Sequence, residues 1–385
     1  METVALAPYK AVADAIKETG GEAFKLCYQC GLCETVCPWN NVREFHIRKI
    51  INQAKLGVVP LESDDMWLCT TCRRCVQQCP RGVQIIDIMR AMRRLLVPDG
   101  VVPASVPNLR GVMTSIASEG NPWRQQAKDR ANWAKDLGIK EFDENTQLLY
   151  FPCCTSAYDP RVQKAAQATG KILTGVGENF GILGPKETCC GESVRKAGNE
   201  DLFKRLAKEN IKTFIDSGVK KIVVSSPHCY HTFKNEYSEF KVNFEVVHTT
   251  EYLYEKINNG KIRPTKEYKK TVAYHDPCYL GRHNNIYDQP REILKSIPGV
   301  KLVEIAENRE SSLCCGGGGA RIWMETPRNE RFSDIRVKQA LEAGADVLVT
   351  ACPYCIMNFE DSKLNIPGAE GLEIKDITEI VQETT

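Results

Sequence analysis

Residues 27–38 read CYQCGLCETVCP and residues 69–80 read CTTCRRCVQQCP, two copies of one arrangement of cysteines. Both have the spacing C-x2-C-x2-C-x3-C-P, which is typical of the ligands of paired four-iron clusters. Three thiolates on one tight loop can bind three irons of a cubane, whereas the fourth cysteine points away and reaches the neighbouring cluster. The proline after it prevents the chain from continuing as a helix across the ligand. The two runs therefore predict two cubane [4Fe–4S] clusters that exchange one ligand each.

This exchange divides the eight cysteines into two sets. The first cluster is expected on Cys27, Cys30, Cys33 and Cys79, and the second on Cys69, Cys72, Cys75 and Cys37. Four cysteines also bind zinc, but zinc sites normally use separated CxxC pairs instead of a run of four. Arg73, Arg74 and Arg81 lie beside the second run, where positive charge would favour the reduced cluster. They are equally typical of a solvated surface.

The segments around these runs indicate helices. Residues 41–57 carry apolar side chains at helical spacing (Val42, Phe45, Ile50 and Leu56) and end on Gly57. Residues 84–97 read QIIDIMRAMRRLLV, which predicts a second helix with a basic face. We therefore expect residues 1–97 to form a helical domain of ferredoxin type with two clusters. Residues 98–146 are interpreted as a linker with short helices.

Composition limits the classes of protein and compartment. The 385 residues include 18 cysteines, and the formal net charge is +2. This near balance gives no case for binding nucleic acid or an anionic membrane surface, and no apolar run approaches the roughly 18 residues of a membrane-spanning helix. The N-terminus does not have the pattern of a secretory signal. We expect a cytoplasmic protein, with attachment to a membrane complex through a partner as the alternative location. Its cysteines are expected to bind metal, with a disulfide framework as the disfavoured alternative.

From residue 147 onward, short β-branched strands alternate with amphipathic helices, which predicts an α/β architecture with parallel sheet. The expected strands are 148–151, 221–225, 242–248, 271–274, 301–305 and 347–350. The expected helices are 160–173, 200–217, 290–296 and 330–343. The whole chain is thus expected to be an α+β multidomain protein, in which a helical two-cluster domain precedes a repeated α/β domain.

The cysteines of this second region repeat. Cys154, the pair Cys189–Cys190 with Gly191, and the stretch SSPHC form the first frame; Cys278, the pair Cys314–Cys315 with Gly316, and ACPYC form the second. Between the single cysteine and the pair lie 34 residues in the first frame and 35 in the second. This repeat predicts two half-domains with a pseudo-twofold relation, at residues 147–260 and 261–385.

The two frames differ in their number of thiols. The second offers five: Cys278, Cys314, Cys315, Cys352 and Cys355. The first offers four at equivalent positions, Cys154, Cys189, Cys190 and Cys229, because Ser226 stands where the second has Cys352. Cys153 is a possible substitute, although neighbouring residues on a strand point to opposite faces. Strand ends and the loops after them are where α/β folds place their sites.

With these motifs in place, the chain resembles the heterodisulfide reductases. The pattern of one cysteine, CCG and CxxC in two copies, behind a two-cluster ferredoxin-type run, is similar to a fusion of the C and B subunits of that enzyme, as in its D-subunit form. The stretches YHDPCYLGRHNNIYDQPREIL (residues 274–294) and SPHCYHTFKNEY (residues 226–237) strengthen the resemblance. It covers roughly residues 20–385, and it does not fix the substrate.

The resemblance implies cofactors and chemistry for the two CCG sites. A complete site would hold a noncubane [4Fe–4S] cluster on five cysteines, and a disulfide would be cleaved between two such clusters while the cubanes deliver electrons singly. The second site is complete and is expected to be the reactive one. The first lacks a ligand at Ser226, because a hydroxyl is a poor soft-metal ligand. Its four thiols suit a cubane or a structural zinc.

Several residues near these sites are candidates for supporting roles. His275, three residues before Cys278, is a candidate proton donor to a leaving thiolate, with a structural role at a strand end as the alternative. His228 and His231 flank Cys229 and are more typical of packing or a hydrogen bond behind the ligand. Arg195 and Arg321 follow the two CCG motifs and are expected either to steer an anionic substrate or to form salt bridges. The glycines of CCGGGGAR (residues 314–321) are expected to let backbone amides approach cluster sulfurs.

No flavin or nucleotide fingerprint is visible, so we expect a flavoprotein or other redox subunits as partners and no hydride chemistry in this chain. Two hypotheses follow. In the first, electrons pass through the two cubanes to the second CCG site, which acts on a small disulfide or thiol. In the second, the chain is an electron wire between a flavoprotein and another carrier and breaks no sulfur bond. Ser226 favours the second hypothesis.

Overall fold

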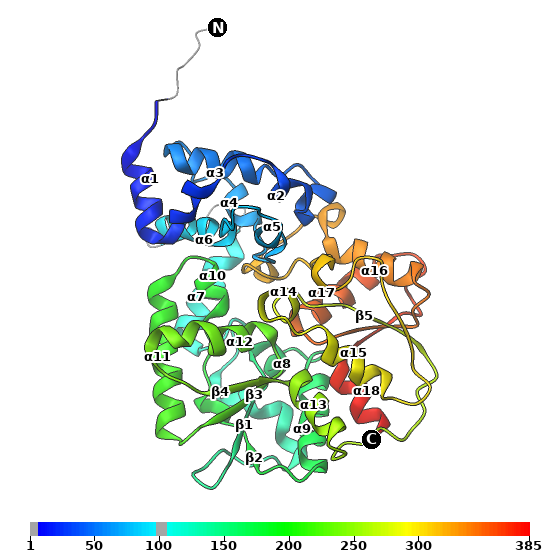
Figure 1. The fold of residues 1–385 in the computed structure, drawn as a ribbon. Coiled ribbons are helices and arrows are strands. Elements are labelled where there is room, and N and C mark those ends of the chain that lie inside the picture. Colours follow the sequence, from blue (N-terminus) through cyan, green and yellow to red (C-terminus); the bar gives the residue numbers. More distant parts are fainter. Residues whose placement is uncertain (1–6, 98–105) are drawn as a thin grey trace.

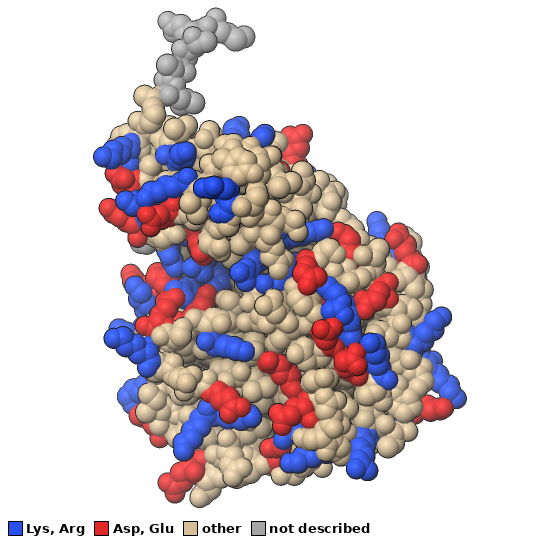
Figure 2. All heavy atoms as spheres, viewed as in Figure 1, with Lys and Arg blue, Asp and Glu red and all other residues tan. Residues whose placement is uncertain are grey.

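A computed structural model describes residues 7–97 and 106–385 of the chain. A helical N-terminal part lies against two sheet-containing halves (Figure 1). Basic and acidic side chains are interspersed over the face drawn in Figure 2, as the balanced charge predicts. Among the described residues, no helix is both long enough and apolar enough to cross a membrane. The predicted linker begins at residue 98, so its first residues, 98–105, lie outside the described part.

The N-terminal part consists of short helices around the two cysteine runs: α1 (Lys10–Ile16), α2 (Leu32–Thr35), α3 (Ile47–Leu56), α4 (Asp65–Leu68), α5 (Arg74–Gln77) and α6 (Ile85–Leu96). Helix α3 begins later than the spacing predicted. The Asn40 side chain accepts a hydrogen bond from the Phe45 amide at 2.7 Å and donates to the Phe45 carbonyl at 3.1 Å, which holds the chain before α3 in a turn. The helix ends where predicted, at Gly57, whose φ of 70° suits glycine.

Helix α6 has the predicted extent, but its arginines do not form a solvated basic face. Arg93 is completely buried, and Arg90 and Arg94 are largely buried against acidic residues of the first half. After α6, helix α7 (Pro107–Glu119) and the 3₁₀ segment η4 (Ala127–Leu137) occupy the described part of the predicted linker.

Each half contains a four-stranded parallel sheet. The first half has the strand order β2-β1-β3-β4, and the second has β6-β5-β7-β8, the same order counted from its own first strand. The strands are β1 (Leu148–Phe151), β2 (Phe180–Gly181), β3 (Lys221–Val224), β4 (Glu245–His248), β5 (Thr271–Tyr274), β6 (Lys301–Val303), β7 (Val347–Thr350) and β8 (Glu373–Asp376). β1 pairs in register with β3 from Leu148 opposite Lys221, and β5 pairs with β7 from Val272 opposite Val347.

Helices cover both sheets. Those of the first half are α8 (Cys154–Tyr158), α9 (Gln163–Gly175), α10 (Glu192–Lys196), α11 (Glu200–Asp216), α12 (Pro227–His231) and α13 (Thr249–Asn258). Those of the second are α14 (Gly281–Asn284), α15 (Asp288–Lys295), α16 (Phe332–Glu342), α17 (Pro353–Lys363) and α18 (Ile377–Thr384). The predicted strands and helices of the repeat are present with shifted ends. Strands β2 and β8 were not predicted, because β2 has two residues and β8 is mostly polar. The helices that were not predicted are α8, α10, α12, α13, α14, α17 and α18.

The two halves contact each other through helix α9 and the residues just before it. Helix α18 of the second half packs on α9 of the first (Figure 1). Arg161, just before α9, donates hydrogen bonds to Glu360 of α17 at 2.5 Å and to Glu379 of α18 at 3.1 Å. The central strands β1 and β7 are buried along their whole length. This packing holds the carboxyl ends of the strands in place. The cysteines of the repeat lie in the segments that follow those strand ends.

Candidate iron–sulfur sites

The two cysteine runs of the N-terminal part line two separate small cavities. One is lined by Cys27, Cys30, Cys33 and Cys79, and the other by Cys37, Cys69, Cys72 and Cys75. These are the two sets that the spacing predicted, with one cysteine of each run facing the cavity of the other. Arg81 lines the first cavity and not the second, contrary to expectation. Arg74 forms a salt bridge with Glu307 at 3.0 Å. This contact agrees with the alternative expectation, in which the arginine is a surface residue.

The two cavities differ in their access to solvent. In the first set Cys30 is exposed, Cys27 and Cys79 are half-buried and Cys33 is buried. In the second set Cys72 and Cys75 are buried and Cys37 and Cys69 are half-buried, so that none is exposed. Three large apolar side chains around the first set are also exposed: Leu26, Tyr28 and Leu32, at 45%, 58% and 46%. The first set therefore lies at an apolar part of the surface, and the second lies inside the molecule.

The second CCG site brings five thiols into one connected group. Hydrogen bonds join Cys278 to Cys314 and Cys314 to Cys315. Cys315 and Cys355 have their Sγ atoms 3.2 Å apart, and Cys355 contacts Cys352. Burial opposes ionisation of Cys352, but hydrogen bonds from Cys355 and His228 lower its pKa to about 5. All five side chains are buried, as a soft-metal site isolated from water requires.

This site adjoins the buried set of the N-terminal part. The thiols of Cys72 and Cys314 hydrogen-bond each other, and the Thr70 hydroxyl lies 3.9 Å from the Cys314 sulfur. The glycine run explains the close approach. A Cβ at Gly318 would lie 2.3 Å from the Thr70 carbonyl oxygen, and one at Gly319 would lie 2.2 Å from that of Cys69. These two glycines serve contact with the neighbouring cysteine loop, whereas the prediction placed their role at cluster sulfurs.

The expected amide contact is made by the first glycine after each cysteine pair. The Gly316 amide donates to the Cys314 sulfur at 3.3 Å, and the Gly191 amide donates to the Cys189 sulfur at 3.4 Å. Both glycines have positive φ, 95° and 87°, a region that side chains with a Cβ rarely adopt. The two halves therefore orient the first cysteine of their pairs in the same way.

The first CCG site contains the four predicted thiols and one more. Cys154 contacts Cys189, and the Cys190 thiol accepts hydrogen bonds from Cys189 and Cys229, which lower the pKa of Cys190 to about 6. Cys153 contacts Cys229 at the end of this group. Arg130 donates to the Cys154 sulfur at 3.4 Å and pairs with buried Glu187 at 2.9 Å. Arg130 lies in the segment interpreted as a linker, where no sequence pattern pointed to it.

Two buried cations near these thiols, Arg93 and Arg282, have no matching carboxylate among the described residues. Arg93 donates to the carbonyl oxygens of Met66, Cys69, Lys196 and Gly319, at 2.7–3.0 Å. Arg282 donates to the carbonyl oxygens of Cys72 at 2.7 Å, Ser312 at 2.7 Å and Glu310 at 3.1 Å. Among the described residues, neither forms a salt bridge with a carboxylate. A buried charge requires a partner of opposite sign.

Thiolate-ligated clusters would supply that negative charge. Three polar atoms near the cysteine groups are buried with no hydrogen-bond partner among the described residues: Nη2 of Arg130, Nη2 of Arg282 and Nε2 of His275. Unsatisfied donors at a thiolate-rich site are expected where an anionic group is to be bound. The donor set, the burial and the unpaired cations therefore fit iron–sulfur clusters.

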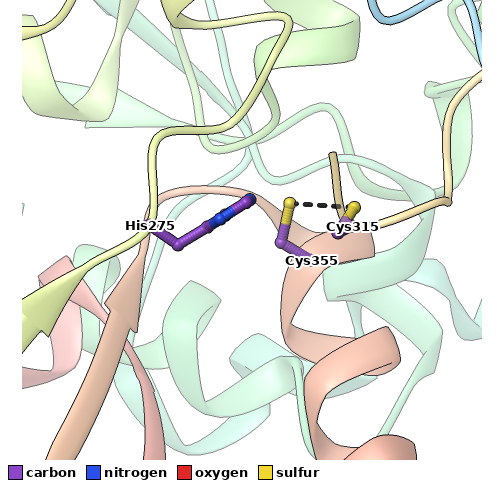
Figure 3. A group of neighbouring side chains, drawn as sticks. All are labelled: His275, Cys315 and Cys355. Atoms are coloured by element: carbon purple, nitrogen blue, oxygen red, sulfur yellow. Dashed lines mark hydrogen bonds between the residues drawn. The ribbon is translucent and has the colours of Figure 1, made fainter. Parts of the chain in front are cut away.

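His275 points at the second CCG site from the end of β5 (Figure 3). Its ligand atom and those of Cys315 and Cys355 all lie within 4.8 Å of one another. Arg336 donates to His275 Nδ1 at 3.1 Å, so the ring proton is on Nε2. Burial, followed by the charges of Arg336 and Arg282, holds the pKa of His275 well below its usual value. A neutral imidazole donates a hydrogen bond but is a weak acid, which does not support the expected role in protonating a leaving thiolate.

Side chains of both halves fill the space between the two CCG sites. His228 Nδ1 donates a hydrogen bond to the Glu192 carboxylate at 3.0 Å, and the ring contacts Cys352 of the other half. Burial opposes its protonation, but Glu192 and Cys352 raise the pKa of His228 to about 10. Its ring lies 4.2 Å from that of Tyr279 and 4.7 Å from that of Tyr354. His228 thus connects the two sites, a role that exceeds the packing expected for it.

A cavity of about 460 Å³ adjoins the second site. Its lining includes Cys315, Gly316, Arg321, Trp39 and Asn358. Arg321 lines this cavity and donates hydrogen bonds to the Glu325 carbonyl at 2.9 Å and to the Thr326 hydroxyl at 2.6 Å. Arg195 forms salt bridges with Glu200, Glu236 and Glu239. Of the two candidates for steering a substrate, Arg321 therefore lies beside this cavity, whereas Arg195 has the salt-bridged role that was the alternative expectation.

Family models match three segments of the chain. A 4Fe-4S dicluster domain covers residues 23–83, and a cysteine-rich domain named CCG covers residues 148–234 and again 272–360. The two CCG matches fall on the two sheets, and the dicluster match contains both cysteine runs.

The D subunit of the dihydromethanophenazine:CoB–CoM heterodisulfide reductase of Methanosarcina barkeri is 34% identical over 93% of this chain and 93% of its own length. The chain belongs to the family of heterodisulfide reductase D subunits. Its dicluster and CCG domains identify it as an iron–sulfur protein.

Two relatives from outside the methanogens are longer. The probable iron-sulfur-binding oxidoreductase FadF of Bacillus subtilis is 40% identical over 86% of this chain and 48% of its own length. The EtfAB:quinone oxidoreductase of Syntrophomonas wolfei is 36% identical over 83% of this chain and 46% of its own length. The chain spans about half the length of these two curated relatives.

Proposed function

We propose that this chain carries electrons one at a time between a docked partner and the second CCG site, through the two cubane clusters. The first cubane would be held by Cys27, Cys30, Cys33 and Cys79, and the second by Cys37, Cys69, Cys72 and Cys75. The second CCG site would hold a noncubane cluster on Cys278, Cys314, Cys315, Cys352 and Cys355. We infer that residues 147–260 and 261–385 are two half-domains with a pseudo-twofold relation, preceded by the cluster domain (1–97) and the linker (98–146).

The contact between Cys72 and Cys314 carries this proposal. We call the cubane on Cys37, Cys69, Cys72 and Cys75 the inner cubane, and the one on Cys27, Cys30, Cys33 and Cys79 the outer cubane. A thiol–thiol hydrogen bond joins Cys72, a candidate ligand of the inner cubane, to Cys314, a candidate ligand of the second CCG site. Electron tunnelling falls steeply with distance, so adjacent ligands make this the favoured route. Arg282 reinforces it, because the charges of Cys72, Cys278 and Cys314 all act on this one guanidinium.

The partner would dock at the first cubane. Exposed apolar residues grouped on a surface mark interaction sites, and Leu26, Tyr28 and Leu32 surround the exposed Cys30. The names of the relatives point to the class of partner, because one contains EtfAB and another belongs to a multi-subunit reductase. A flavoprotein is therefore the first candidate, and a quinone-linked carrier the second.

His275 would act on the second cluster as a hydrogen-bond donor. With Nδ1 occupied by Arg336, Nε2–H is directed at the sulfurs of Cys315 and Cys355. A donor to a ligand sulfur stabilises added negative charge, which raises the reduction potential of the cluster.

A second candidate function is reduction of a small disulfide at the second site alone. The cavity beside Cys315, with Arg321 in its wall, supports it. Cleavage between two facing clusters has less support, because His228, Tyr279 and Tyr354 occupy the space between the sites.

Anaerobic purification with metal analysis and EPR tests both functions. With a further four-iron cluster at the first CCG site, the four clusters would give about sixteen irons per chain, and chemical reduction should bring up cubane signals and a distinct CCG signal. A signal that appears only when thiol is added to the oxidised protein, and is lost in Arg321→Gln, would favour disulfide chemistry. Iron near eight per chain with zinc in the remaining sites would refute the electron route to the second CCG site.

A further inference from the structure

Compared with the second half, the first half lacks a cysteine at one candidate ligand position and has an additional cysteine at another. At the start of the CxxC segment the first half has Ser226 where the second has Cys352, a loss of one thiol. Before the single cysteine the first half has Cys153, where the second has Pro277, a gain of one thiol. Each half therefore has five cysteines near its sheet end, although four of the positions are shared and the fifth is not.

The contacts of the fifth thiol are the same in both halves. In the second half the thiols form the sequence Cys278, Cys314, Cys315, Cys355 and Cys352, each in contact with the next. In the first half the sequence is Cys154, Cys189, Cys190, Cys229 and Cys153. Cys352 contacts Cys355, and Cys153 contacts Cys229, which is the equivalent of Cys355 in the first half. Cys153 thus makes the corresponding contact from another loop.

The backbone at Cys153 is an independent observation. Its φ of 78° and ψ of 157° lie in a region populated almost only by glycine. A side chain with a Cβ is disfavoured there, yet the residue is cysteine and is 4% exposed. This conformation is what turns the side chain toward Cys229 and away from the alternate face that a regular strand would give it. Strained backbone of this kind occurs where the side chain has a function.

We propose that Cys153 supplies the fifth thiolate of the first CCG site in place of the thiol absent at Ser226, so that this site binds a five-cysteine cluster like the second site. This inference rests on the proposed function, in which the CCG sites hold iron–sulfur clusters. It replaces the expectation of a four-cysteine cubane or a structural zinc at the first site.

The substitution Cys153→Gly removes the thiol and relieves the backbone strain, so the chain should fold at least as well as wild type. The full-length protein, purified anaerobically with ⁵⁷Fe, would be measured by Mössbauer spectroscopy, and its zinc by mass spectrometry. Wild type should show two five-cysteine clusters and no zinc. Cys153→Gly should lose this signature at one of the two, and Cys153→Gly/Ser226→Cys should regain it. Ser226→Cys alone should add no iron.

An unchanged spectrum and iron content in Cys153→Gly would overturn the inference, as would one equivalent of zinc in wild type. Cys153→Ala is the matched control, because it removes the thiol but keeps the Cβ; it should match Cys153→Gly in spectrum and have a lower melting temperature. The signal of the cluster at the second CCG site distinguishes failure of the fifth-ligand inference from failure of the proposed function. If it persists and is reduced through the cubanes while Cys153→Gly has no effect, only the fifth-ligand assignment fails.

Discussion

Single side chains influence the electrostatics of the inner sites, and Arg282 is one that lies close to two of them. It is buried, contacts the Cys72 carbonyl and lies among the thiols of both the inner cubane set and the second CCG set. A hydrogen bond to a charged group contributes about 1.5–3 kcal/mol, and about 1.4 kcal/mol corresponds to 59 mV for one electron.

Arg282→Gln should therefore lower the reduction potential of at least one of these two clusters by about 60–130 mV. Loss of the cation removes stabilisation of the more negative, reduced state. A potentiometric titration followed by EPR gives the shift, and Arg282→Lys, which keeps the charge, should shift less than half as much. Equal potentials in wild type and Arg282→Gln would show that the guanidinium is neutralised elsewhere.

Glu236 is one of the residues that join the N-terminal part to the first half. Its carboxylate forms salt bridges with Arg90 of α6, Arg195 and Lys196 of α10. Burial opposes its ionisation, but Lys196, Arg195 and Arg90 lower the pKa of Glu236 to about 2. Because the folded-state pKa is depressed, the stabilisation is complete above the unfolded value near 4.5 and is lost as the pH falls toward 2.

Glu236→Gln should therefore reduce the free energy of unfolding by about 3–5 kcal/mol at every pH from about 5 to 9, because it leaves buried cations unpaired. Urea unfolding under anaerobic conditions measures this loss. Glu370→Gln, at an exposed position of the second half, is the control and should change stability by less than about 0.5 kcal/mol. A pH-dependent difference inside that window would contradict the assigned pKa.

At the scale of elements, the glycine run after Cys315 determines how closely the second CCG loop approaches the loop of the inner cubane. Gly319→Ala would place a Cβ against the Cys69 carbonyl. Because the obstacle is backbone, the loops must separate. Electron transfer from the inner cubane to the CCG cluster should slow at least tenfold, with the iron content of the first cubane unchanged.

Flash reduction with optical detection measures that rate. Gly371→Ala is the matched control, since a Cβ there meets no atom within 4 Å, and it should retain the wild-type rate. A wild-type rate in Gly319→Ala would mean that the electron route does not depend on this contact.

The sequence predicted the elements that depend on residues close together in the chain, and it did not predict features that depend on contacts between remote segments. The cysteine spacing and the β-branched runs predicted the sets of thiols and six of the eight strands. Helix α3 was predicted to begin too early because Val42 and Phe45 have helical spacing, yet Asn40 holds them in a turn. No sequence pattern marked Arg93 or Arg130 as part of a site, because their hydrogen-bond partners lie in segments remote in sequence. The orientation of Cys153 depends on a φ that strand alternation does not anticipate.

At the scale of the whole molecule, the clusters would lie in order from an exposed apolar surface to the interior. Tyr28→Glu and Leu32→Glu should each slow reduction by a flavoprotein donor at least tenfold, because a charge is placed in the docking surface. Reduction by dithionite, which needs no docking, should be unaffected. Leu364→Glu, at an exposed apolar residue of the second half, should leave both rates unchanged; equal slowing in all three variants would remove this surface as the docking site.

The central claim is that electrons reach the second CCG site through the cubanes in order. Rapid freeze-quench EPR of the anaerobic protein, mixed with a reduced flavoprotein, tests it most directly. The outer cubane signal should rise first, the inner cubane next and the CCG signal last, and Cys75→Ser, which removes a ligand of the inner cubane, should abolish the last step. A CCG signal that appears before the cubane signals, or at the wild-type rate in Cys75→Ser, would contradict the account.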